Sequence, residues 1–417
     1  MYELKGAIIS LSDVLAVEGE PDKKLFIKTI KLLKFLISKD VQPILISNSK
    51  WTLTTSKKEF HIFLSEKVGQ TLPYYQGGRD IPYKQKAGAV KAILQKHDWV
   101  PQEVVYIGNT KEDMISASHG KLLFLNAKWH KKSNPYGFEF SSPKALAKFI
   151  DCCCLTPKDW FWSLEEGDLR VYALAPFGEY SKQYPEAKVY STNAKNTVKY
   201  DKGNVRFWGL LMAARIHMSG IGAEVEYACP YPGHSVESEK AEFLNAIKIV
   251  AGSLRAKYLE DLITRHITAL KSQTLRKQKK SPSAANQLNT IHLRRDPVRT
   301  GPKALRYKSP PLGKGKTVLV VDDICTQGFS LEAARNFVEA TGAKVILLAV
   351  LKTPGPNHYH QTTSIKPKLT NAYKPYTLSS NKTVQHDNSH CVKNPNAAKE
   401  IGRAFLKFSN WKWPEGI

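Results

Sequence analysis

Residues 318–330 read VLVVDDICTQGFS, and this stretch decides the fold of the second half of the chain. Its four leading apolar residues predict a buried strand, which ends in Asp322 and Asp323. The sequence SLEAARNFVEATGA begins at Ser330 and has the spacing of an amphipathic helix. A strand, a short loop and a helix in this order are typical of an open α/β sheet, which binds ligands at the carboxyl ends of its strands.

The loop between Thr326 and Ser330 suits a phosphate group. It offers hydroxyls, a glycine and successive backbone N–H groups just before a helix N-terminus, where the helix dipole is positive. Two carboxylates beside it suit sugar hydroxyls and a hydrated Mg²⁺, so the residues predict a site for a phosphorylated sugar. Two alternatives stay open. One is the second motif of a P-loop nucleotidase, although GKGKT at 313–317 lacks the first Gly of its partner motif; the other is a sheet edge without function.

The rest of the second half alternates between strands and helices. We expect strands at 171–175, 224–228, 317–321 and 344–350, and helices at 205–217, 240–270 and 330–341. Residues 271–316 have little periodicity and predict a mobile, basic arm, because 265–316 hold fourteen Lys and Arg residues and one acid. The charged residues of interest in this arm are Arg276, Lys277, Lys279, Lys280, Arg294 and Arg295.

The first half has the same alternation and predicts one doubly wound α/β domain over residues 1–150. We expect its strands at 6–10, 43–47, 104–107 and 121–125, and its helices at 25–37 and 86–97. Residues 151–168 read DCCCLTPKDWFWSLEEGD and predict a linker, followed by a second domain at 169–355. Residues 356–417 predict a polar, basic tail with one short helix, at 397–408.

Composition limits the class of protein. The chain has 417 residues, 42% of them hydrophobic, and a net charge of +25, so a folded protein with a preference for polyanions is expected. Six cysteines, three of them contiguous at 152–154, form no spaced disulfide framework. Since no apolar run reaches the length of a membrane helix, we expect a cytoplasmic protein without membrane contact. His358, His360, His386, His390 and Cys391 match no standard zinc spacing and predict a solvated segment.

The stretch at 318–330 resembles the phosphoribosyl pyrophosphate (PRPP) signature of type I phosphoribosyltransferases. The resemblance implies that Asp322 and Asp323 hold the ribose hydroxyls, with Mg²⁺ bound largely through PRPP. It also implies a second doubly wound domain with a parallel sheet. By the same resemblance the 5′-phosphate is wrapped by Thr326, Gln327, Gly328, Phe329 and Ser330. Gln327 and Phe329 depart from the family pattern, in which small residues are usual at these positions.

The order of further motifs is similar to that of competence-associated phosphoribosyltransferases. These motifs are PFGEY at 176–180, KY at 199–200 and PYPGHS at 230–235, followed by the basic arm with its Arg294-Arg295 pair. The resemblance covers about 170–352. It implies a pyrophosphate loop that includes Pro232, Gly233 and His234, and an arm that closes over PRPP.

The first half resembles the haloacid dehalogenase (HAD) superfamily in layout. The positions that match its motifs are Ser10, Ser12, Ser47, Lys86, Asn109 and Asp113. An aspartyl-phosphate mechanism needs two carboxylates where this chain has Ser10 and Ser12, and Asn109 removes charge from the implied Mg²⁺ site. We therefore expect an inactive HAD-like domain with a structural, regulatory or ligand-sensing role. An active hydrolase that uses Asp13, or an unrelated doubly wound fold, stays open.

The leading functional prediction is a Mg²⁺-dependent phosphoribosyltransferase that uses PRPP and a nucleobase-like or nucleotide-like acceptor and releases pyrophosphate. The acceptor is expected between the 176–180 loop, the 230–235 loop and the basic arm. One alternative is a nucleic-acid-associated or phage-defence effector, such as a partner of a reverse transcriptase or another nucleic-acid enzyme, whose arm docks on DNA or RNA. Another is a non-catalytic PRPP-binding regulator. A homodimer is compatible with each.

Overall fold

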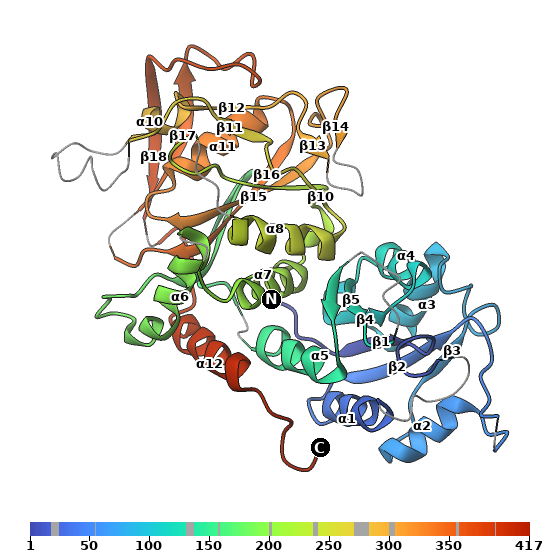
Figure 1. The fold of residues 1–417 in the computed structure, drawn as a ribbon. Coiled ribbons are helices and arrows are strands. Elements are labelled where there is room, and N and C mark those ends of the chain that lie inside the picture. Colours follow the sequence, from blue (N-terminus) through green and yellow to red (C-terminus); the bar gives the residue numbers. More distant parts are fainter. Residues whose placement is uncertain are drawn as a thin grey trace.

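The computed structural model describes residues 1–17, 25–54, 56–130, 137–156, 159–199, 202–236, 241–270, 283–299, 305–355, 358–387 and 389–417. Two α/β halves lie side by side, and helices α7 and α8 run between their sheets (Figure 1). The N-terminal half contains strands β1 to β6, and the C-terminal half contains the remaining strands together with the last helix, α12. The predicted fold class, α/β with two wound parallel sheets, is confirmed.

The N-terminal sheet has six strands in the order β3-β2-β1-β4-β5-β6, and every neighbouring pair is parallel. Its strands are β1 (Gly6–Ser10), β2 (Gln42–Ser47), β3 (Tyr74–Gln76), β4 (Val104–Gly108), β5 (Leu123–Ala127) and β6 (Phe138–Phe140). Its helices are α1 (Phe26–Ile37), α2 (Phe60–Val68), α3 (Ala87–His97), α4 (Lys111–His119) and α5 (Pro143–Phe149), with the short turn η1 at Pro101–Glu103. The strand order reverses between β1 and β4, which is the edge where such sheets bind ligands.

The second sheet has seven strands in the order β10-β9-β15-β16-β8-β7-β19. The strands from β10 to β8 in this order are all parallel. At the edge, β7 is antiparallel to both of its neighbours, β8 and β19. The strands are β7 (Trp162–Glu166), β8 (Leu169–Pro176), β9 (Tyr227–Pro230), β10 (Lys257–Tyr258), β15 (Thr317–Cys325), β16 (Lys344–Lys352) and β19 (Val392–Lys393). This sheet therefore takes strands from both sides of the predicted 169–355 range.

Helices and small antiparallel sheets complete this half. Element η2 (Ile150–Cys154) continues from α5 and belongs to the first half. The helical elements of the second half are η3 (Pro185–Ala187), α6 (Lys188–Lys199), α7 (Val205–Ser219), η4 (Ile221–Ala223), α8 (Ala241–Leu254), α10 (Ala285–Leu288), α11 (Phe329–Glu339) and α12 (Ala397–Asn410). The small sheets pair β11 (Ile263–Arg265) with β12 (Ile291–Leu293), β13 (Val298–Arg299) with β14 (Leu305–Arg306), and β17 (Tyr359–Lys366) with β18 (Ser380–His386).

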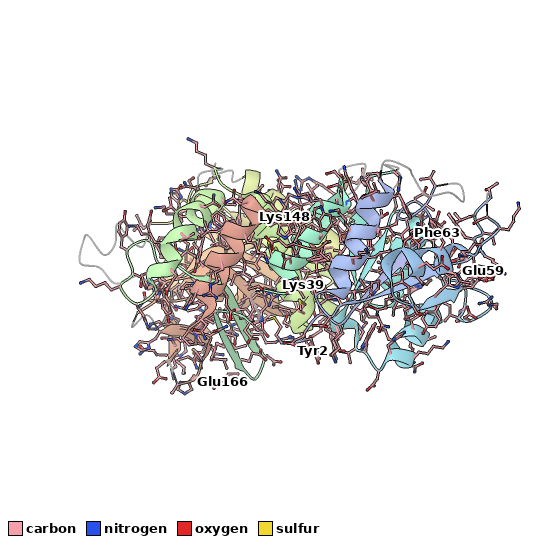
Figure 2. All side chains as sticks on the ribbon, turned by 90° about the horizontal axis from the view of Figure 1, so that it is seen from below. Tyr2, Lys39, Glu59, Phe63, Lys148 and Glu166 are labelled. Carbon is pink, nitrogen blue, oxygen red and sulfur yellow. The ribbon has the colours of Figure 1, made fainter. Side chains whose placement is uncertain are left out.

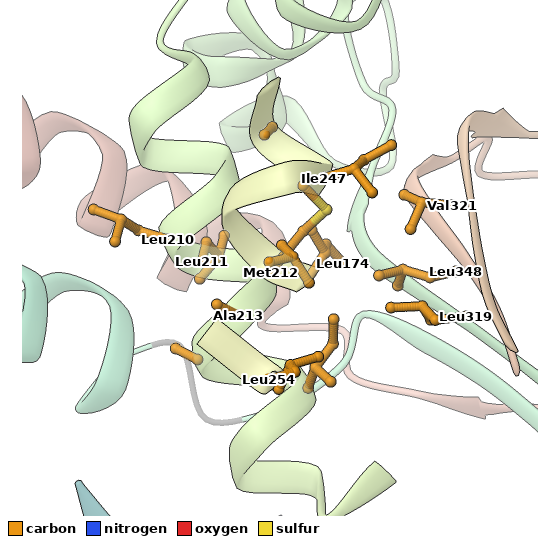
Figure 3. Close-up of a cluster of buried hydrophobic side chains, with 14 of the residues drawn as sticks. Leu174, Leu210, Leu211, Met212, Ala213, Ile247, Leu254, Leu319, Val321 and Leu348 are labelled. Carbon is orange, nitrogen blue, oxygen red and sulfur yellow. The ribbon is translucent and has the colours of Figure 1, made fainter. Parts of the chain in front are cut away.

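The core of this half forms where α7 and α8 pack on the sheet. Figure 3 shows Leu319, Val321 and Leu348 of the sheet facing the two helices, with Met212 and Ile247 between them. Every residue of α7 from Phe207 to Met218 is buried, because neighbours surround this helix on all sides. A helix that is buried all round has no amphipathic pattern, and its apolar sequence follows from that position.

Contacts between the two halves are polar as well as apolar. On α7, Arg215 donates to the carbonyl of Cys153 at 2.9 Å, and the Nε2 of His217 lies 3.1 Å from the carbonyl of Val104. Beyond α8, Arg255 donates to the carbonyl of Ala117 in α4 at 2.9 Å. The two halves therefore share one packed interface.

The C-terminal helix α12 closes the junction from the other side. Trp411 donates through Nε1 to Asp151 at 2.7 Å, and Lys407 forms an ion pair with the same carboxylate at 2.8 Å. The ammonium of Lys148, which is labelled in Figure 2, lies 4.1 Å from the ring centroid of Phe408. The segment at 356–417, expected as a polar tail, is thus built into the fold through α12, β17 and β18.

Two further expectations are wrong. The helix expected at 240–270 ends at Leu254, because Arg255 adopts a left-handed φ of 61° and strands β10 and β11 follow. The expected linker at 151–168 is largely structured: Cys152–Cys154 are buried in η2, and β7 joins the second sheet. Within the 271–316 arm, the described residues form α10 and strands β12 to β14, whereas Arg276, Lys277, Lys279 and Lys280 lie outside the described residues.

In the described part of the chain, no helix has both the length and the hydropathy that crossing a membrane requires.

The buried His217 predicts how stability depends on pH. Burial lowers the pKa of this imidazole to about 4 in the folded protein, against an ordinary value of 6.5. The stability that neutral His217 provides is present above pH 6.5 and is lost as the pH falls toward 4, because only the unfolded chain binds the proton in that window. Between pH 7 and 4.5, His217→Gln should therefore lose about 2–3 kcal/mol less unfolding free energy than the parent. Urea unfolding at both pH values measures this, and equal losses would contradict it.

Candidate functional site

The two acids of the central strand stand at the carboxyl edge of the second sheet. Asp322 pairs in register with Ala349 of β16, and its side chain is buried. Its Oδ1 accepts a hydrogen bond from the backbone N–H of Asp323 at 2.8 Å. Asp323 in turn accepts through Oδ1 from the N–H of Ile324 at 2.6 Å. These bonds fix the orientation of both carboxylates at the edge where ligands bind.

An open hollow of about 480 Å³ lies beside these acids. All five residues of the predicted phosphate loop line it, together with Asp322 of the strand and with Ser283, Asn286 and Gln287 from the segment around α10. The structure therefore brings most of the predicted PRPP residues to one place. Asp323 is adjacent in the chain but is not among the described residues that line the hollow.

Gly328 is required by the shape of the phosphate loop. It has a φ of 86°, and a Cβ at this position would lie 2.2 Å from the ring of Tyr359. The residue is the N-cap of α11, so the loop turns sharply and leads directly into the helix. The first N–H groups of α11 and the positive end of its dipole therefore face the hollow, as a phosphate cradle needs.

A buried ion pair anchors this helix to the β17–β18 hairpin. Glu332 is fully buried and lies 2.6 Å from Arg335, which also donates to the carbonyl of Thr362 at 2.6 Å. Glu332 accepts from the Tyr359 hydroxyl at 2.8 Å and from the Thr362 N–H at 2.7 Å. Our sequence analysis missed Glu332 and Arg335, although two opposite charges three residues apart on an amphipathic helix were a visible signal.

The same hairpin covers part of the phosphate loop. The N–H of His360 donates to the carbonyl of Gln327 at 3.0 Å, and the ring of His360 lies 5.3 Å from that of Phe329. Phe329, where the family pattern has a small residue, thus has a packing partner in β17. Among the described residues, no group of three or more His, Cys, Asp or Glu side chains is placed to hold a metal ion.

The predicted pyrophosphate loop follows β9, the strand next to β15. The N–H of Tyr231 donates to the carbonyl of Val321 at 2.8 Å, which holds this loop against the central strand. Burial raises the pKa of Tyr231 to about 12; the nearby Arg265 guanidinium opposes this rise and the Asp322 carboxylate adds to it. Pro232, Gly233 and His234 come directly after this tyrosine, but none of them is among the described residues that line the hollow beside the acids.

Arg265 organises the pyrophosphate loop from β11. Its guanidinium is buried and donates to the carbonyl of Gly233 and, at 2.6 Å, to the hydroxyl of Thr290. It also lies 3.1 Å from the Gln287 Oε1, the same atom that accepts from the Tyr231 hydroxyl at 2.7 Å. Our sequence analysis counted Arg265 only as part of a basic stretch, since nothing local marked it as buried.

The arginine pair of the arm lies elsewhere. Arg294 forms an ion pair with Asp261 at 3.0 Å. Burial raises the pKa of Tyr373, and the positive charge of Arg295 opposes that rise. Neither is among the described residues that line the hollow.

The HAD-like positions of the first half meet at the carboxyl edge of its sheet, around Asp113. This buried carboxylate forms an ion pair of 2.7 Å with Lys84, whose ammonium also donates to the hydroxyl of Ser10 at 3.2 Å. The other carboxylate oxygen accepts from the N–H groups of Asn109 and Thr110, each at 3.0 Å. Lys84 thus takes the place that the sequence analysis gave to Lys86, which is exposed at the start of α3.

The remaining residues of this site do not suit a divalent cation. The Asn109 amide is turned toward the carbonyl of Ala127, and the Tyr106 hydroxyl donates to Asp113 at 3.2 Å. Burial and the nearby Asp113 raise the pKa of Tyr106 well above its ordinary value, so this hydroxyl stays protonated. Mg²⁺ needs several oxygen ligands, and the one carboxylate of this cluster is already neutralised by a lysine. The residues therefore do not fit the metal that a HAD phosphatase requires.

The two other predicted positions contribute hydroxyls, and the alternative nucleophile Asp13 follows one of them. Ser47 is buried at the end of β2 and accepts through Oγ from the N–H of Ser49 at 3.2 Å. Ser12 lies 3.5 Å through its Oγ from the carboxylate of Asp13, which has a left-handed φ of 59°.

Together, the parallel sheet, the paired acids and the glycine-led helix N-terminus define an open α/β domain of the class that binds ligands at the carboxyl edge of its sheet. The comparison with protein families agrees: residues 256–372 match the model of the phosphoribosyl transferase domain. The second half therefore contains a phosphoribosyl transferase domain, as the sequence resemblance predicts. No curated protein is significantly similar to the chain in sequence.

Solved structures similar to the chain include HAD-superfamily proteins. One is a HAD-superfamily hydrolase of subfamily IA from Geobacter sulfurreducens, with 11% identity over 36% of this chain and 96% of that one, at a TM-score of 0.25. Another is 3-deoxy-D-manno-octulosonate 8-phosphate phosphatase from Moraxella catarrhalis, with 12% identity over 35% and 85%, at a TM-score of 0.26. UMP synthase from Leishmania donovani is similar over 84% of this chain and 65% of that one, with 11% identity and a TM-score of 0.19. We draw no activity from scores this low.

The buried ion pair of the first half predicts a large difference between two neighbouring lysines. Lys84→Met should lower the unfolding free energy by about 3–5 kcal/mol, because it leaves the Asp113 carboxylate buried without its cation. Lys86→Met is the matched control and should change it by no more than about 0.5 kcal/mol, because this side chain is exposed. Urea unfolding followed by circular dichroism measures both. Equal effects of the two substitutions would show that the ion pair does not support the fold.

Proposed function

We propose that the chain is a Mg²⁺-dependent phosphoribosyltransferase, which transfers the 5-phosphoribosyl group of PRPP to a nucleobase-like or nucleotide-like acceptor. The observation that carries the proposal is the arrangement at the end of β15, where Asp322 and Asp323 stand directly before the glycine-led cradle of α11. The phosphoribosyl transferase match over 256–372 supports the same activity.

Each part of PRPP has a partner in this arrangement. The two carboxylates would accept hydrogen bonds from the ribose 2′- and 3′-hydroxyls, and the N–H groups at the start of α11 would bind the 5′-phosphate. Tyr231 and the loop after it, held by Arg265, would face the pyrophosphate, because β9 lies beside β15. The acids are hard oxygen donors of the kind that Mg²⁺ prefers, and the bound metal would take most of its ligands from the oxygens of PRPP.

The transfer itself breaks one bond and forms one. The bond between ribose C1 and pyrophosphate breaks, and pyrophosphate leaves with the electron pair. The acceptor nucleophile then bonds to C1 and gives up its proton. The carboxylates of Asp322 and Asp323 would stabilise the positive charge that builds on the ribose ring. Bound Mg²⁺ would offset the negative charge that grows on the departing pyrophosphate.

Asp323→Asn should abolish PRPP-dependent pyrophosphate release while leaving the thermal unfolding midpoint nearly unchanged, because the carboxylate is partly exposed and its amide replacement has the same size. Pyrophosphate release in the presence of PRPP, Mg²⁺ and a metabolite extract measures the effect. Asp168→Asn, on an exposed turn, is the matched control and should retain full activity.

Unchanged pyrophosphate release in Asp323→Asn would overturn the assignment of the site. Tight PRPP binding by the parent without any pyrophosphate release would instead favour a non-catalytic, PRPP-binding regulator. Nucleic-acid binding through the arm stays a prediction, because four of the six basic residues singled out in it lie outside the described part of the chain.

For the first half, we propose a HAD-like domain without phosphatase activity. Serines stand at 10 and 12 in place of the two carboxylates that the mechanism needs, and Lys84 neutralises Asp113. Its contacts with α7 and with Arg255 support a structural role.

The parent chain should therefore hydrolyse para-nitrophenyl phosphate with Mg²⁺ no faster than the Asp13→Asn variant does. Phosphate release measured on both proteins tests this. If the parent has a Mg²⁺-dependent rate of hydrolysis that Asp13→Asn removes, the result would contradict the proposal and support Asp13 as the nucleophile.

A further inference from the structure

The hollow beside the acids has a wall that the predicted PRPP residues do not supply. This wall comes from the segment around α10, which packs against α11 and contributes Ser283, Asn286 and Gln287. Among the described residues that line the hollow, none is Lys or Arg. The hydrogen-bond donors that these residues offer to a phosphate are therefore neutral.

The two amide side chains of this wall differ in the groups that they leave unbonded. Asn286 uses both ends of its amide on Leu270: Oδ1 accepts from the backbone N–H at 3.2 Å, and Nδ2 donates to the carbonyl at 2.8 Å. Gln287 uses only Oε1, which accepts from the Tyr231 hydroxyl at 2.7 Å and from Arg265 at 3.1 Å. Its Nε2 has no hydrogen-bond partner in the described part of the chain.

Arg265 determines which end of the Gln287 amide faces it. A guanidinium only donates hydrogen bonds, so the atom that it contacts must be the carbonyl oxygen of the amide. The NH₂ group is therefore turned away from Arg265. It stays available as a donor on a side chain that lines the hollow.

Arg265 is a buried cation that forms no ion pair among the described residues. Its hydrogen bonds run to neutral groups, those of Gly233, Thr290, Tyr231 and Gln287. Buried charges are costly unless they are paired. An anion bound by the Nε2 of Gln287 would lie one amide group away from this cation. The hydrogen bond from Arg265 to Oε1 would also strengthen the N–H donors at the other end of the amide.

The 5′-phosphate is the part of PRPP that this amide would meet. All five residues of the phosphate loop line the same hollow as Gln287. The Tyr231 hydroxyl, which donates to Gln287, also has Ser330 of that loop as a hydrogen-bond partner. One phenol thus links the amide to the first turn of α11, where the phosphate cradle lies.

We propose that Gln287 binds the 5′-phosphate of PRPP through Nε2, and that Arg265 is the positioning residue that orients and polarises its amide. The inference rests on the proposed phosphoribosyltransferase function. It adds a side-chain donor from the arm to a cradle formed by the N–H groups and hydroxyls of the phosphate loop. Through this neutral amide, a buried cation attracts the phosphate without lining the hollow itself.

Gln287→Glu separates ligand binding from folding. The carboxylate keeps an oxygen toward Arg265 and Tyr231, so the thermal unfolding midpoint should not fall, whereas the donors are lost and a negative charge faces the phosphate. Calorimetry with Mg²⁺ measures the affinity of the full chain for PRPP, ribose 5-phosphate and pyrophosphate. We expect binding of PRPP and of ribose 5-phosphate to weaken at least tenfold, and binding of pyrophosphate to change less than threefold.

Two further variants separate the lost donors from the added charge. Gln287→Met removes the donors without adding a charge and should weaken ribose 5-phosphate at least threefold. Gln70→Glu, at an exposed position just after α2, adds the same charge elsewhere and should change no affinity. Unchanged ribose 5-phosphate affinity in either Gln287 variant would overturn the proposal. An equal loss of pyrophosphate affinity would do so too, because the amide would then lie at the other end of PRPP.

Failure of this inference can be told from failure of the proposed function. If the parent binds neither PRPP nor ribose 5-phosphate, both the proposed function and the role of Gln287 fall. If the parent binds both ligands and the Gln287 variants bind them equally well, only the role of Gln287 falls.

Discussion

The buried ion pair between Glu332 and Arg335 is the interaction on which the candidate site depends most. It lies one turn into α11, the helix whose N-terminus forms the phosphate cradle, and it joins that helix to Tyr359 and Thr362 of β17. Two buried charges are costly unless further hydrogen bonds satisfy them, and here the hairpin supplies those bonds. The cradle, the helix and the hairpin therefore form one rigid unit, and Gly328 is fitted against a ring that this unit holds in place.

The sequence was enough to predict the α/β architecture and the loop that follows the two acids of the central strand. Strands such as Gly6–Ser10 and Thr317–Cys325 are short apolar runs between turns, and this pattern is local. The loop from Thr326 to Ser330 could also be found, because its chemistry is contained in consecutive residues. The hollow that this loop lines is completed by Ser283, Asn286 and Gln287, which come from a distant segment and were not predicted.

What could not be predicted depends on contacts between distant parts of the chain. From the sequence, Lys84 and Lys86 are equally plausible as the lysine of the HAD-like site. Only the fold shows that the ammonium of Lys84 reaches Asp113. The segment after 355 is polar because it forms a two-stranded hairpin and a surface helix, and composition alone does not distinguish such elements from a solvated tail. Arg255 has a left-handed backbone and ends the helix after Leu254, although helix propensity alone would place an arginine inside a helix.

The burial of α7 from Phe207 to Met218 has a consequence for how the chain can change over generations. A helix with no polar face needs a partner on each side, and the first half supplies one through Val104 and the buried turn at Cys152–Cys154. Selection acts on the side chains of the first half that cover α7, whether or not the first half has a catalytic activity. The positions around Ser10 and Ser12 could therefore drift away from catalysis, whereas the side chains that cover α7 could not. Fusion of the two halves is hard to reverse, because separation would expose an apolar helix to water.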